Sequence, residues 1–248
     1  MHRILFQFGS LTLYSYGFFV AMGFLVSTFL ILRESEKAGF SRNDIFDAVI
    51  VVLISGLIGA RLLFVMINWE YYSQNLSRVL MFYEGGLAFQ GGAFFAILAG
   101  IVFAWKKKLS FFKGADLIAP YILLGHAVGR IGCFFNGCCY GRPICNGLGV
   151  TYPGEAVMRI PVQLYSSFIM LLMFLLLVQI KEKKPFDGFT FAMYLVLYSY
   201  HRFFMDFFRG DRLVSFFEFQ TLSQSISIFM FFSGVFLYLF LKRKQPHQ

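Results

Sequence analysis

The stretch ADLIAPYILLGHAVGRIGCFF, residues 115–135, is apolar along nearly its whole length but carries an arginine at position 130. About 20 apolar residues in a helix suffice to cross roughly 30 Å of hydrocarbon. A charged arginine at mid-bilayer costs about 2.5 to 3.5 kcal/mol on insertion scales, so such a residue is a candidate for a functional site. The stretch therefore predicts a transmembrane helix that holds a cation within the membrane.

The composition of the 248-residue chain indicates that the whole molecule lies in a membrane. Hydrophobic residues make up 58% of it, aromatic residues 20% and charged residues only 14%, which excludes an ordinary water-soluble domain. The apolar runs long enough to span a bilayer are 11–32, 45–67, 87–105, 115–135, 163–180, 188–208 and 222–241. We expect an all-α, polytopic membrane protein with about seven transmembrane helices, formed by one domain over residues 1–248.

Basic residues follow the odd-numbered runs and predict the topology of the chain in the membrane. They are Arg33, Lys37, Arg42, Lys106 to Lys108, Lys181, Lys183, Lys184 and Lys242 to Lys244. Because lysine and arginine accumulate on the cytoplasmic side, we expect a periplasmic amino terminus, a cytoplasmic carboxyl terminus and outer segments near 68–86 and 136–162. The net charge of +9 then reflects the membrane, and no nucleic-acid partner is expected. The first run is too long for a cleaved signal peptide and is expected to remain as a span.

Three arginines within the predicted spans are placed at similar depth. Arg61, Arg130 and Arg202 each follow the start of an even-numbered span by about 14 to 16 residues, or roughly 21 to 24 Å of helix. Tyr16 and Gln90, on odd-numbered spans, are expected at about the same level. A shared polar layer in the outer half of the membrane is one interpretation. Separate snorkelling of each arginine to the outer headgroups is the other.

Glycine doublets flank Gln90 in EGGLAFQGG, residues 84–92. Two doublets weaken a helix, and they suggest a break that lines a cavity. Gly56 and Gly59, by contrast, fit ordinary close packing of helices.

The segment HRFFMDFFR, residues 201–209, places Arg202, Asp206 and Arg209 on one helix face, where they can form an ion-pair ladder. One carboxylate between two guanidinium groups leaves a net positive charge, and Arg130 and Arg61 add to it. Forked guanidinium donors suit a phosphate group. In the outer leaflet, that phosphate is most simply a phospholipid headgroup.

The four cysteines, Cys133, Cys138, Cys139 and Cys145, all lie at or beyond the outer end of the fourth predicted span. A disulfide or tight packing near a turn is the expected role in an oxidising compartment. The spacing lacks a clean pair of the C-x-x-C type and no histidine follows, so we expect no metal site. A catalytic thiol is a weaker alternative, because nothing identifies an adjacent base.

The chain resembles the prolipoprotein diacylglyceryl transferases, bacterial inner-membrane enzymes with the signature GRxGNFxNxExxG. Here GRIGCFFNGCCYG, residues 129–141, keeps the signature's arginine as Arg130, its second asparagine as Asn136 and its last glycine as Gly141. Further matches are YSYG at 14–17, GARL at 59–62, GGLAFQGG at 85–92, PVQLY at 161–165 and the arginine–aspartate–arginine set of the sixth span. The matches therefore extend from the first predicted span to the sixth.

The resemblance implies transfer of the diacylglyceryl group from phosphatidylglycerol to the lipobox cysteine thiol of a preprolipoprotein signal peptide. A thioether forms and glycerol 1-phosphate leaves. The reaction needs the lipid bilayer and no cofactor or metal. The implied location is the bacterial cytoplasmic (inner) membrane.

The resemblance also implies roles for individual residues. Those implied as catalytic are Arg130, Arg202, Tyr16 and, at the position of the family's histidine, Gln90. Those implied in binding the substrate are Arg61, Asn136, Gly141, Tyr198, Asp206, Arg209 and His126. Three positions depart from the family pattern: Gln90 replaces the histidine, Cys133 the signature's first asparagine and Cys138 its glutamate. Gln90 cannot accept a proton at neutral pH, which leaves another group, such as His126 or His201, or the positive field itself, to activate the substrate thiol.

Two other classes of membrane protein remain as alternatives. A transporter or binding protein for an organic anion or phospholipid would also place cations at a broken helix, although near the midplane and with an inverted repeat. A seven-span receptor would share the orientation of the amino terminus but would not require three intramembrane arginines.

Overall fold

The computed structural model describes residues 3–8, 11–81, 85–145, 147, 149–154, 156–210, 214–217 and 220–244. The chain divides into two compact units. The first unit comprises residues 1–31 and 115–248, and the second comprises residues 32–114.

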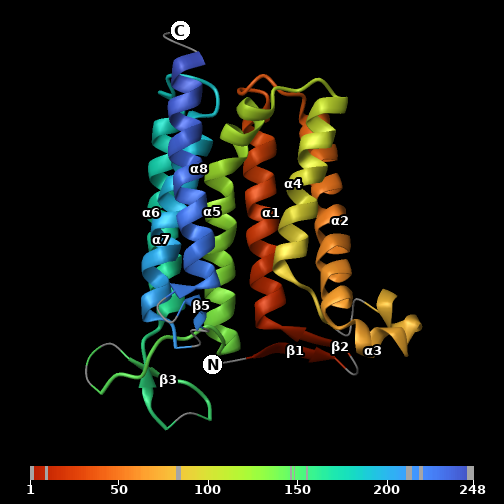
Figure 1. The fold of residues 1–248 in the computed structure, drawn as a ribbon, viewed down its shortest axis with the longest axis vertical. Coiled ribbons are helices and arrows are strands. Elements are labelled where there is room, and N and C mark those ends of the chain that lie inside the picture. The colour runs from red at the N-terminus through yellow and green to blue at the C-terminus, as the bar shows by residue number, and fades with distance from the viewer. Residues whose placement is uncertain are drawn as a thin grey trace. The chain divides into compact units, whose positions relative to one another are not determined.

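Every predicted span is a helix in the structure (Figure 1). The long helices are α1 (Ser15–Ser35), α2 (Arg42–Ile67), α4 (Phe89–Lys106), α5 (Phe111–Asn136), α6 (Val162–Lys181), α7 (Phe189–Phe208) and α8 (Leu222–Lys244). Within the described ranges, 6 of them are long and apolar enough to cross a membrane, which makes the chain a polytopic membrane protein. The long helix outside that set is α7, because its second half carries the polar residues of the candidate site.

The expectation of an all-α fold was too simple, since short strands lie at the helix ends. Strand β1 (Ile4–Phe8) pairs antiparallel with β2 (Leu11–Tyr14), so the first helix begins at Ser15 and not at residue 11. The other two hairpins are β3 (Val150–Thr151) with β4 (Met158–Arg159), and β5 (Val214–Phe217) with β6 (Gln220–Thr221). In each hairpin, backbone amides and carbonyls of residues outside the helices form hydrogen bonds with one another.

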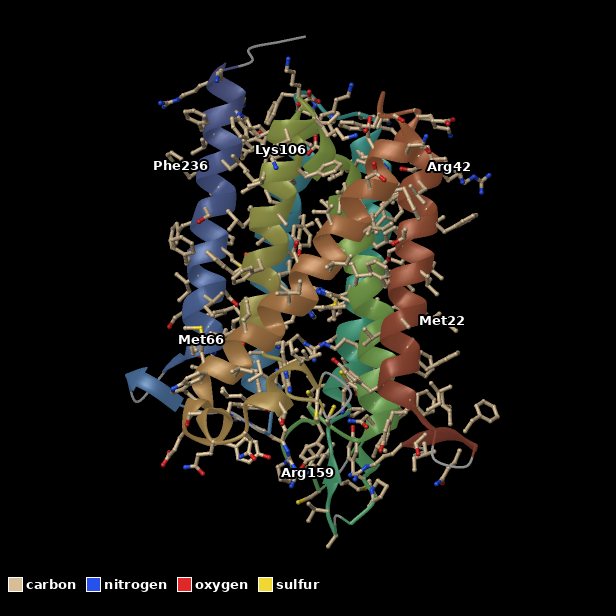
Figure 2. All side chains as sticks on the ribbon, turned by 90° about the vertical axis from the view of Figure 1, so that its right-hand side faces the viewer. Met22, Arg42, Met66, Lys106, Arg159 and Phe236 are labelled. Carbon is tan, nitrogen blue, oxygen red and sulfur yellow. The ribbon has the colours of Figure 1, made fainter. Side chains whose placement is uncertain are left out.

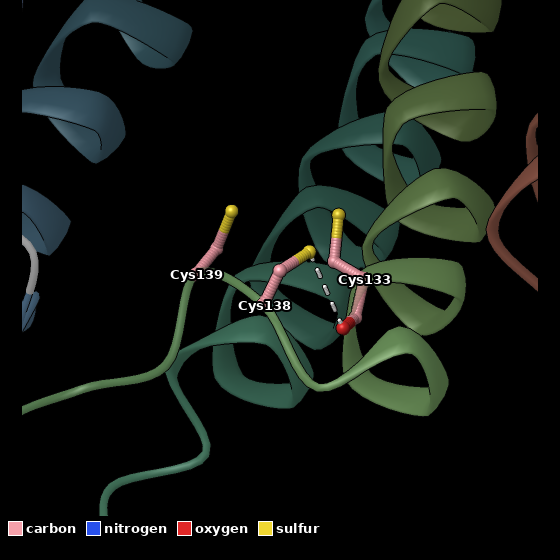
Figure 3. A group of neighbouring side chains, drawn as sticks. All are labelled: Cys133, Cys138 and Cys139. Carbon is pink, nitrogen blue, oxygen red and sulfur yellow. Dashed lines mark hydrogen bonds between the residues drawn. The ribbon is translucent and has the colours of Figure 1, made fainter. Parts of the chain in front are cut away.

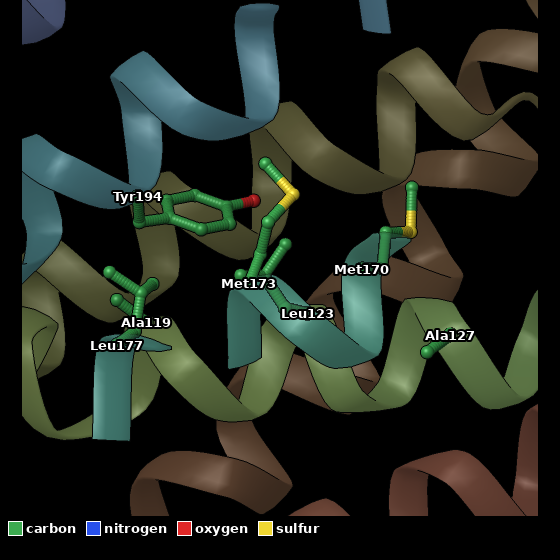
Figure 4. Packing of buried hydrophobic residues seen from close by; sticks show 7 residues of the cluster. All are labelled: Ala119, Leu123, Ala127, Met170, Met173, Leu177 and Tyr194. Atoms are coloured by element: carbon green, nitrogen blue, oxygen red, sulfur yellow. The ribbon is translucent and has the colours of Figure 1, made fainter. Parts of the chain in front are cut away.

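The core of the first unit lies between α5, α6 and α7 (Figure 4). Ala119, Leu123 and Ala127 recur every fourth residue along one face of α5. They contact Met170, Met173 and Leu177 of α6 and Tyr194 of α7. Small alanines allow the helices to approach closely, which favours association in lipid, where apolar burial alone gives no driving force. This packing fixes the relation of α5 to α7, the two helices that carry the candidate cationic site.

Helix α1 packs closely against α5 at two glycines. A Cβ at Gly23 would lie 2.9 Å from the carbonyl oxygen of Gly125, and a Cβ at Gly132 would lie 2.9 Å from Cβ of Phe19. Any larger side chain at these two positions would push the helices apart. The glycines therefore bring Tyr16, at the start of α1, to the carboxyl end of α5.

Helix α7 receives its cap from a carboxylate on another helix. Asp116 of α5 is only 1% exposed, and its oxygens accept hydrogen bonds from the amides of Gly188 at 2.8 Å and Phe191 at 2.9 Å. The Lys184 ammonium pairs with the same carboxylate at 3.0 Å. A negative charge at a helix amino terminus satisfies its free amides and interacts favourably with its dipole. Asp116 thereby fixes the first turn of α7 against α5.

The second unit is built around α2 and α4, which are joined by α3 (Trp69–Ser73) and a short 3-10 helix, η1 (Leu76–Leu80). Gly59 and Gly91 meet where the two long helices cross: a Cβ at Gly91 would overlap the Gly59 carbonyl oxygen. Arg42 and Lys106 lie at one end of this pair and Met66 at the other (Figure 2). Much of the outward surface is apolar, as at Leu57 and Ile58, in keeping with contact to lipid tails.

Candidate functional site

The signature segment bends sharply where α5 ends. Gly137 adopts the left-handed conformation with φ +70°, and its amide donates to the Phe134 carbonyl at 3.1 Å. The next amide, that of Cys138, donates to the Cys133 carbonyl at 3.2 Å. These two bonds form a Schellman motif, for which glycine is the favoured residue at the left-handed position. The motif folds Cys138 back onto the last turn of α5.

Three cysteines come together at this bend (Figure 3). The Sγ atoms of Cys133, Cys138 and Cys139 all lie within 4.8 Å of one another, and the three side chains point to the same side of the loop. Cys139 continues the turn with φ +61°, a conformation that non-glycine residues seldom adopt. The Cys138 thiol also donates to the Cys133 carbonyl at 3.7 Å. None of the three forms a disulfide, so of the two expected roles the structure shows packing at the turn and not a disulfide.

The charge at Cys138 depends on its thiol neighbours and on Arg130. Hydrogen bonds from the Cys133 and Cys139 thiols lower the pKa of Cys138, and Asn136 and the nearby Arg130 charge act in the same direction. Asn136, a predicted binding residue, therefore lies beside the cluster.

A buried glutamine at the start of α6 holds the loop that carries Cys138. The amide nitrogen Nε2 of Gln163, which is fully buried, donates to the Cys138 carbonyl at 2.6 Å. The Tyr152 hydroxyl donates to Oε1 of the same glutamine at 3.0 Å. We did not predict a role for Gln163. The signal was its place in the PVQLY match, where one polar residue interrupts an apolar helix start.

Gly141, the last glycine of the signature, lies where three segments meet. Its amide donates to the Ile160 carbonyl at 2.8 Å, and it forms a β-bridge with Arg209. A Cβ at Gly141 would lie 2.7 Å from side-chain atoms of both Ile160 and Val162. The glycine is therefore required for packing, and it attaches the signature loop to the carboxyl end of α7.

Arg130 and Arg202 approach a common point between α5 and α7. Both charges lie close enough to interact electrostatically with His126, and both interact with His201 as well. The His126 ring lies 5.6 Å from the Tyr198 ring, centroid to centroid. Both arginines are half-buried. The predicted convergence of these two guanidinium groups is thus present within the first unit.

The rest of the predicted arginine–aspartate ladder lies at the end of α7. Arg202 interacts electrostatically with both Asp206 and Arg209. Asp206 is buried, and its Oδ2 accepts a hydrogen bond from the Thr221 hydroxyl at 2.6 Å. Thr221 and Gln224 form a reciprocal capping box at the start of α8, with bonds of 3.1 and 3.2 Å. Asp206 therefore also joins the end of α7 to the residue that caps α8. The residue spacing did not predict this contact.

Tyr16 belongs to the same region of the first unit. It is the second residue of α1, and its side chain is 46% exposed. The phenol lies close enough to Arg130 and to the three thiols for their charges to interact. α1 thus adds a hydroxyl beside the Arg130 guanidinium and the thiols at the end of α5 and in the turn that follows it.

Arg61, in the second unit, has a different kind of environment. It is only 2% exposed, and its guanidinium donates to backbone carbonyls of the segment after α3. The acceptors are the carbonyls of Val79 at 2.9 Å, Gly85 at 2.5 Å, Gly86 at 3.1 Å, Arg78 at 2.6 Å and Met81 at 3.1 Å. The guanidinium carbon also lies 5.3 Å from the Tyr72 ring centroid. A guanidinium has five N–H groups, so these carbonyls use its full donor capacity.

Gln90, also in the second unit, lies in the first turn of α4 and is exposed. The predicted break coincides with the start of this helix: Gly85 and Gly86 have φ of +82° and +76°, whereas Gly91 belongs to the helical packing against α2. The side chain lines a groove of about 240 Å³ whose other walls are Leu62, Leu63, Met66, Gly91, Phe94 and Phe95. Gln90 therefore presents one amide to an otherwise apolar groove.

Taken by itself, the first unit offers cations, an imidazole, a phenol and soft sulfur ligands in one region. Paired guanidinium groups can bind a phosphate and stabilise charge that develops on it. Neutral imidazole can accept a proton. This combination suits displacement of a phosphate leaving group by a sulfur nucleophile.

Comparisons with known proteins agree with this chemistry. The family model described as prolipoprotein diacylglyceryl transferase matches residues 3–240. The chain is 32% identical to phosphatidylglycerol–prolipoprotein diacylglyceryl transferase 2 of Clostridium perfringens, over 98% of this chain and 97% of that protein. It is 34% identical to phosphatidylglycerol–prolipoprotein diacylglyceryl transferase of Finegoldia magna, again over 98% of this chain and 97% of the relative. Since both the family model and these relatives cover nearly its full length, the chain belongs to the prolipoprotein diacylglyceryl transferase family.

Proposed function

We propose that this chain transfers the diacylglyceryl group of phosphatidylglycerol to the lipobox cysteine thiol of a preprolipoprotein signal peptide. The substrate sulfur attacks the glycerol carbon that carries the phosphate, so a C–S bond forms as the C–O bond breaks. Glycerol 1-phosphate leaves with the bonding electron pair. The observation that carries this proposal is the convergence of Arg130 and Arg202 on His126 within one unit.

The two arginines act on the leaving group. The phosphate diester of the lipid carries one negative charge, and the departing monoester gains a second as the C–O bond breaks. Guanidinium donors fixed in a half-buried site stabilise that second charge more strongly than water-exposed donors do. Loss of one donor of this kind costs about 100- to 1,000-fold in turnover in comparable sites.

The neighbouring residues complete the headgroup site. The Tyr16 hydroxyl and the Asn136 amide can donate to phosphate or glycerol oxygens beside Arg130, and Tyr198 does so beside His126. Arg209 adds a further cation next to Arg202, and Asp206 orients this part of α7. Gly141 keeps the signature loop attached to α7.

The two predicted residues of the second unit contribute differently. Arg61 holds the backbone of residues 78–81 and 85–86, because carbonyls of these residues use its donors. Gln90 supplies a neutral amide to an apolar groove suited to part of a lipid or peptide chain.

We place the enzyme in the bacterial cytoplasmic membrane with its amino terminus outside. In the second unit, Arg42 and Lys106 lie at one end of the helix pair (Figure 2), as the excess of cytoplasmic lysine and arginine requires. In the first unit, the last turn of α6 carries Lys181, and the last turn of α8 carries Lys242, Arg243 and Lys244.

The test is a transfer assay with purified protein, phosphatidylglycerol and a lipobox peptide. We expect a thioether-linked diacylglyceryl peptide and one glycerol phosphate per product. Arg130→Ala and Arg202→Ala should abolish turnover, whereas the matched control Arg33→Ala, at an exposed position in the last turn of α1, should retain it. Absence of product from wild-type protein, under conditions in which a related transferase works, would refute the proposed activity.

A further inference from the structure

The three-thiol cluster at the end of α5 has the composition of a metal site. Each of Cys133, Cys138 and Cys139 offers one sulfur, and the sulfurs lie within 4.8 Å of one another. Zinc binds thiolate at about 2.3 Å, so three sulfurs on one tetrahedral ion lie roughly 3.8 Å apart. Small side-chain rotations close the remaining distance. Three cysteine ligands on a fixed turn are a far stronger signal than the sequence spacing alone provided.

We infer that Cys133, Cys138 and Cys139 bind a zinc ion whose fourth position receives the substrate's lipobox thiol. Among the residues that the structure describes, no further histidine, cysteine, aspartate or glutamate belongs to this group. Structural zinc sites have four protein ligands, whereas catalytic sites have three and an open position. The inference deepens the proposed function and rests on it for the identity of the fourth ligand.

The surroundings of the cluster support a preformed site. Cys133 is held by the last turn of α5, and the Schellman motif holds Cys138 next to it through an amide bond of 3.2 Å. Buried Gln163 fixes the Cys138 carbonyl at 2.6 Å and is itself fixed by Tyr152 at 3.0 Å. Outer contacts of this kind orient metal ligands and sustain affinity.

The local charge also fits a metal-bound cluster. One divalent ion with three thiolates carries a net charge of −1, and Arg130 lies close enough to interact with Cys133 and Cys138. The guanidinium therefore compensates the charge of the loaded site in a medium of low dielectric constant. The same guanidinium would then serve two anions, the thiolates of the metal site and the phosphate of the lipid.

Zinc coordination would deprotonate the substrate thiol, which the Gln90 side chain cannot do. A glutamine side chain is not a base at neutral pH, yet the substrate thiol must lose its proton before it can attack. A thiol that coordinates zinc is deprotonated. The substrate thiol gives its proton to solvent as the S–Zn bond forms. The zinc-bound sulfur then attacks the lipid carbon; a C–S bond replaces the S–Zn bond, and glycerol phosphate leaves as the C–O bond breaks.

Cobalt binding tests the site itself. The full-length protein is purified under reducing conditions, treated with a chelator and titrated with Co²⁺ alone. We expect one Co²⁺ per chain with intense sulfur-to-cobalt charge-transfer absorption, displaced by Zn²⁺. The absorption should be lost or strongly weakened in Cys133→Ser, Cys138→Ser and Cys139→Ser. Cys145→Ser is the matched control, since this exposed cysteine lies outside the cluster, and it should bind cobalt like wild type.

Transfer assays on the same samples test the role of the metal. Chelated protein should turn over about 100-fold more slowly or worse, because activation of a nucleophile is typically worth 100-fold or more, and Zn²⁺ should restore the rate. Addition of the lipobox peptide should shift the cobalt absorption, and a peptide with serine in place of the lipobox cysteine should not.

Each other outcome is decisive. Absence of stoichiometric cobalt binding, binding that survives in all three serine variants, or a disulfide among these cysteines in the purified active protein would overturn the inference. Full activity of chelated protein would overturn the role in activating the thiol while leaving the proposed transferase function intact. Cysteine-dependent cobalt binding without transfer by any form of the protein would support the metal site and refute the transferase function together with the role in thiol activation.

Discussion

Arg61 and the pair formed by Arg130 and Arg202 have similar positions in their helices but different surroundings. Arg61 gives its donors to backbone carbonyls of its own unit, and its side chain is almost completely buried. Arg130 and Arg202 are half-buried and interact electrostatically with the same histidines. Arginines at similar positions in their helices can thus have either backbone carbonyls or ionisable side chains as partners. We propose that the first arrangement serves the fold and the second a ligand, so that the partners of the guanidinium group distinguish the two roles.

The largest expected difference is in catalysis. Arg130→Lys and Arg202→Lys retain a positive charge but lose the fork that holds two phosphate oxygens, so we expect turnover to fall by about 100-fold or more with little change in the thermal midpoint. Initial rates of thioether formation and thermal unfolding in detergent measure the two effects. Near-normal rates in both variants would show that these arginines act through charge alone.

For Arg61 we expect the main effect of substitution to be a loss of stability. Arg61→Ala leaves several carbonyls of the segment 78–86 without their donor, and each unmet buried acceptor costs about 1 to 3 kcal/mol. We expect a loss of roughly 3 kcal/mol or more in unfolding free energy, and Arg61→Lys should recover only part of it, because an ammonium group has fewer donors. An active and equally stable Arg61→Ala protein would show that these hydrogen bonds add little.

A smaller effect on stability is expected at Asp116. Asp116→Asn retains the size of the side chain but weakens the cap of α7 and its ion pair, for a loss of about 1 to 3 kcal/mol. Burial alone disfavours the charged form of Lys184, but its bonds to Asp187 and Asp116 raise the pKa of Lys184 above 10.5.

The raised pKa of Lys184 determines how stability changes with pH. The stabilisation from Lys184 is fully present below the unfolded-state value near 10.5 and is lost as pH rises through the higher folded-state value. Wild-type protein should therefore lose this contribution at alkaline pH, and Asp116→Asn should lose less. Thermal midpoints at pH 8 and above pH 10.5 measure the difference. Equal losses in the two proteins would exclude the contact between Asp116 and Lys184 as its source.

Each of the seven predicted spans corresponds to a long helix, and within the described residues six of them are long and apolar enough to cross a membrane. Such helices are predictable because their length and composition follow from the thickness of the bilayer. The sequence also predicted the convergence of Arg130 with Arg202, since charged residues within spans are rare. Contacts that depend on backbone conformation could not be predicted in the same way. The thiol cluster requires the left-handed turn at Gly137 and Cys139, and the environment of Arg61 requires carbonyls of residues 78–81 and 85–86 that point toward its guanidinium group. Neither follows from residue spacing alone.

The smallest effect is expected at Gln90, in the first turn of α4. The amide is neither an acid nor a base at neutral pH, so Gln90→Ala should slow turnover by less than about tenfold through altered packing in its groove. If zinc activates the substrate thiol, Gln90→His should change the zinc-loaded rate little, since a base is then unnecessary. In chelated protein the same histidine should raise the residual rate by about tenfold or more, because it supplies a proton acceptor. Measuring both variants with and without Zn²⁺ separates these effects. A large gain from Gln90→His in the zinc-loaded enzyme would mean that proton removal still limits the reaction, and that the thiol cluster does not perform it.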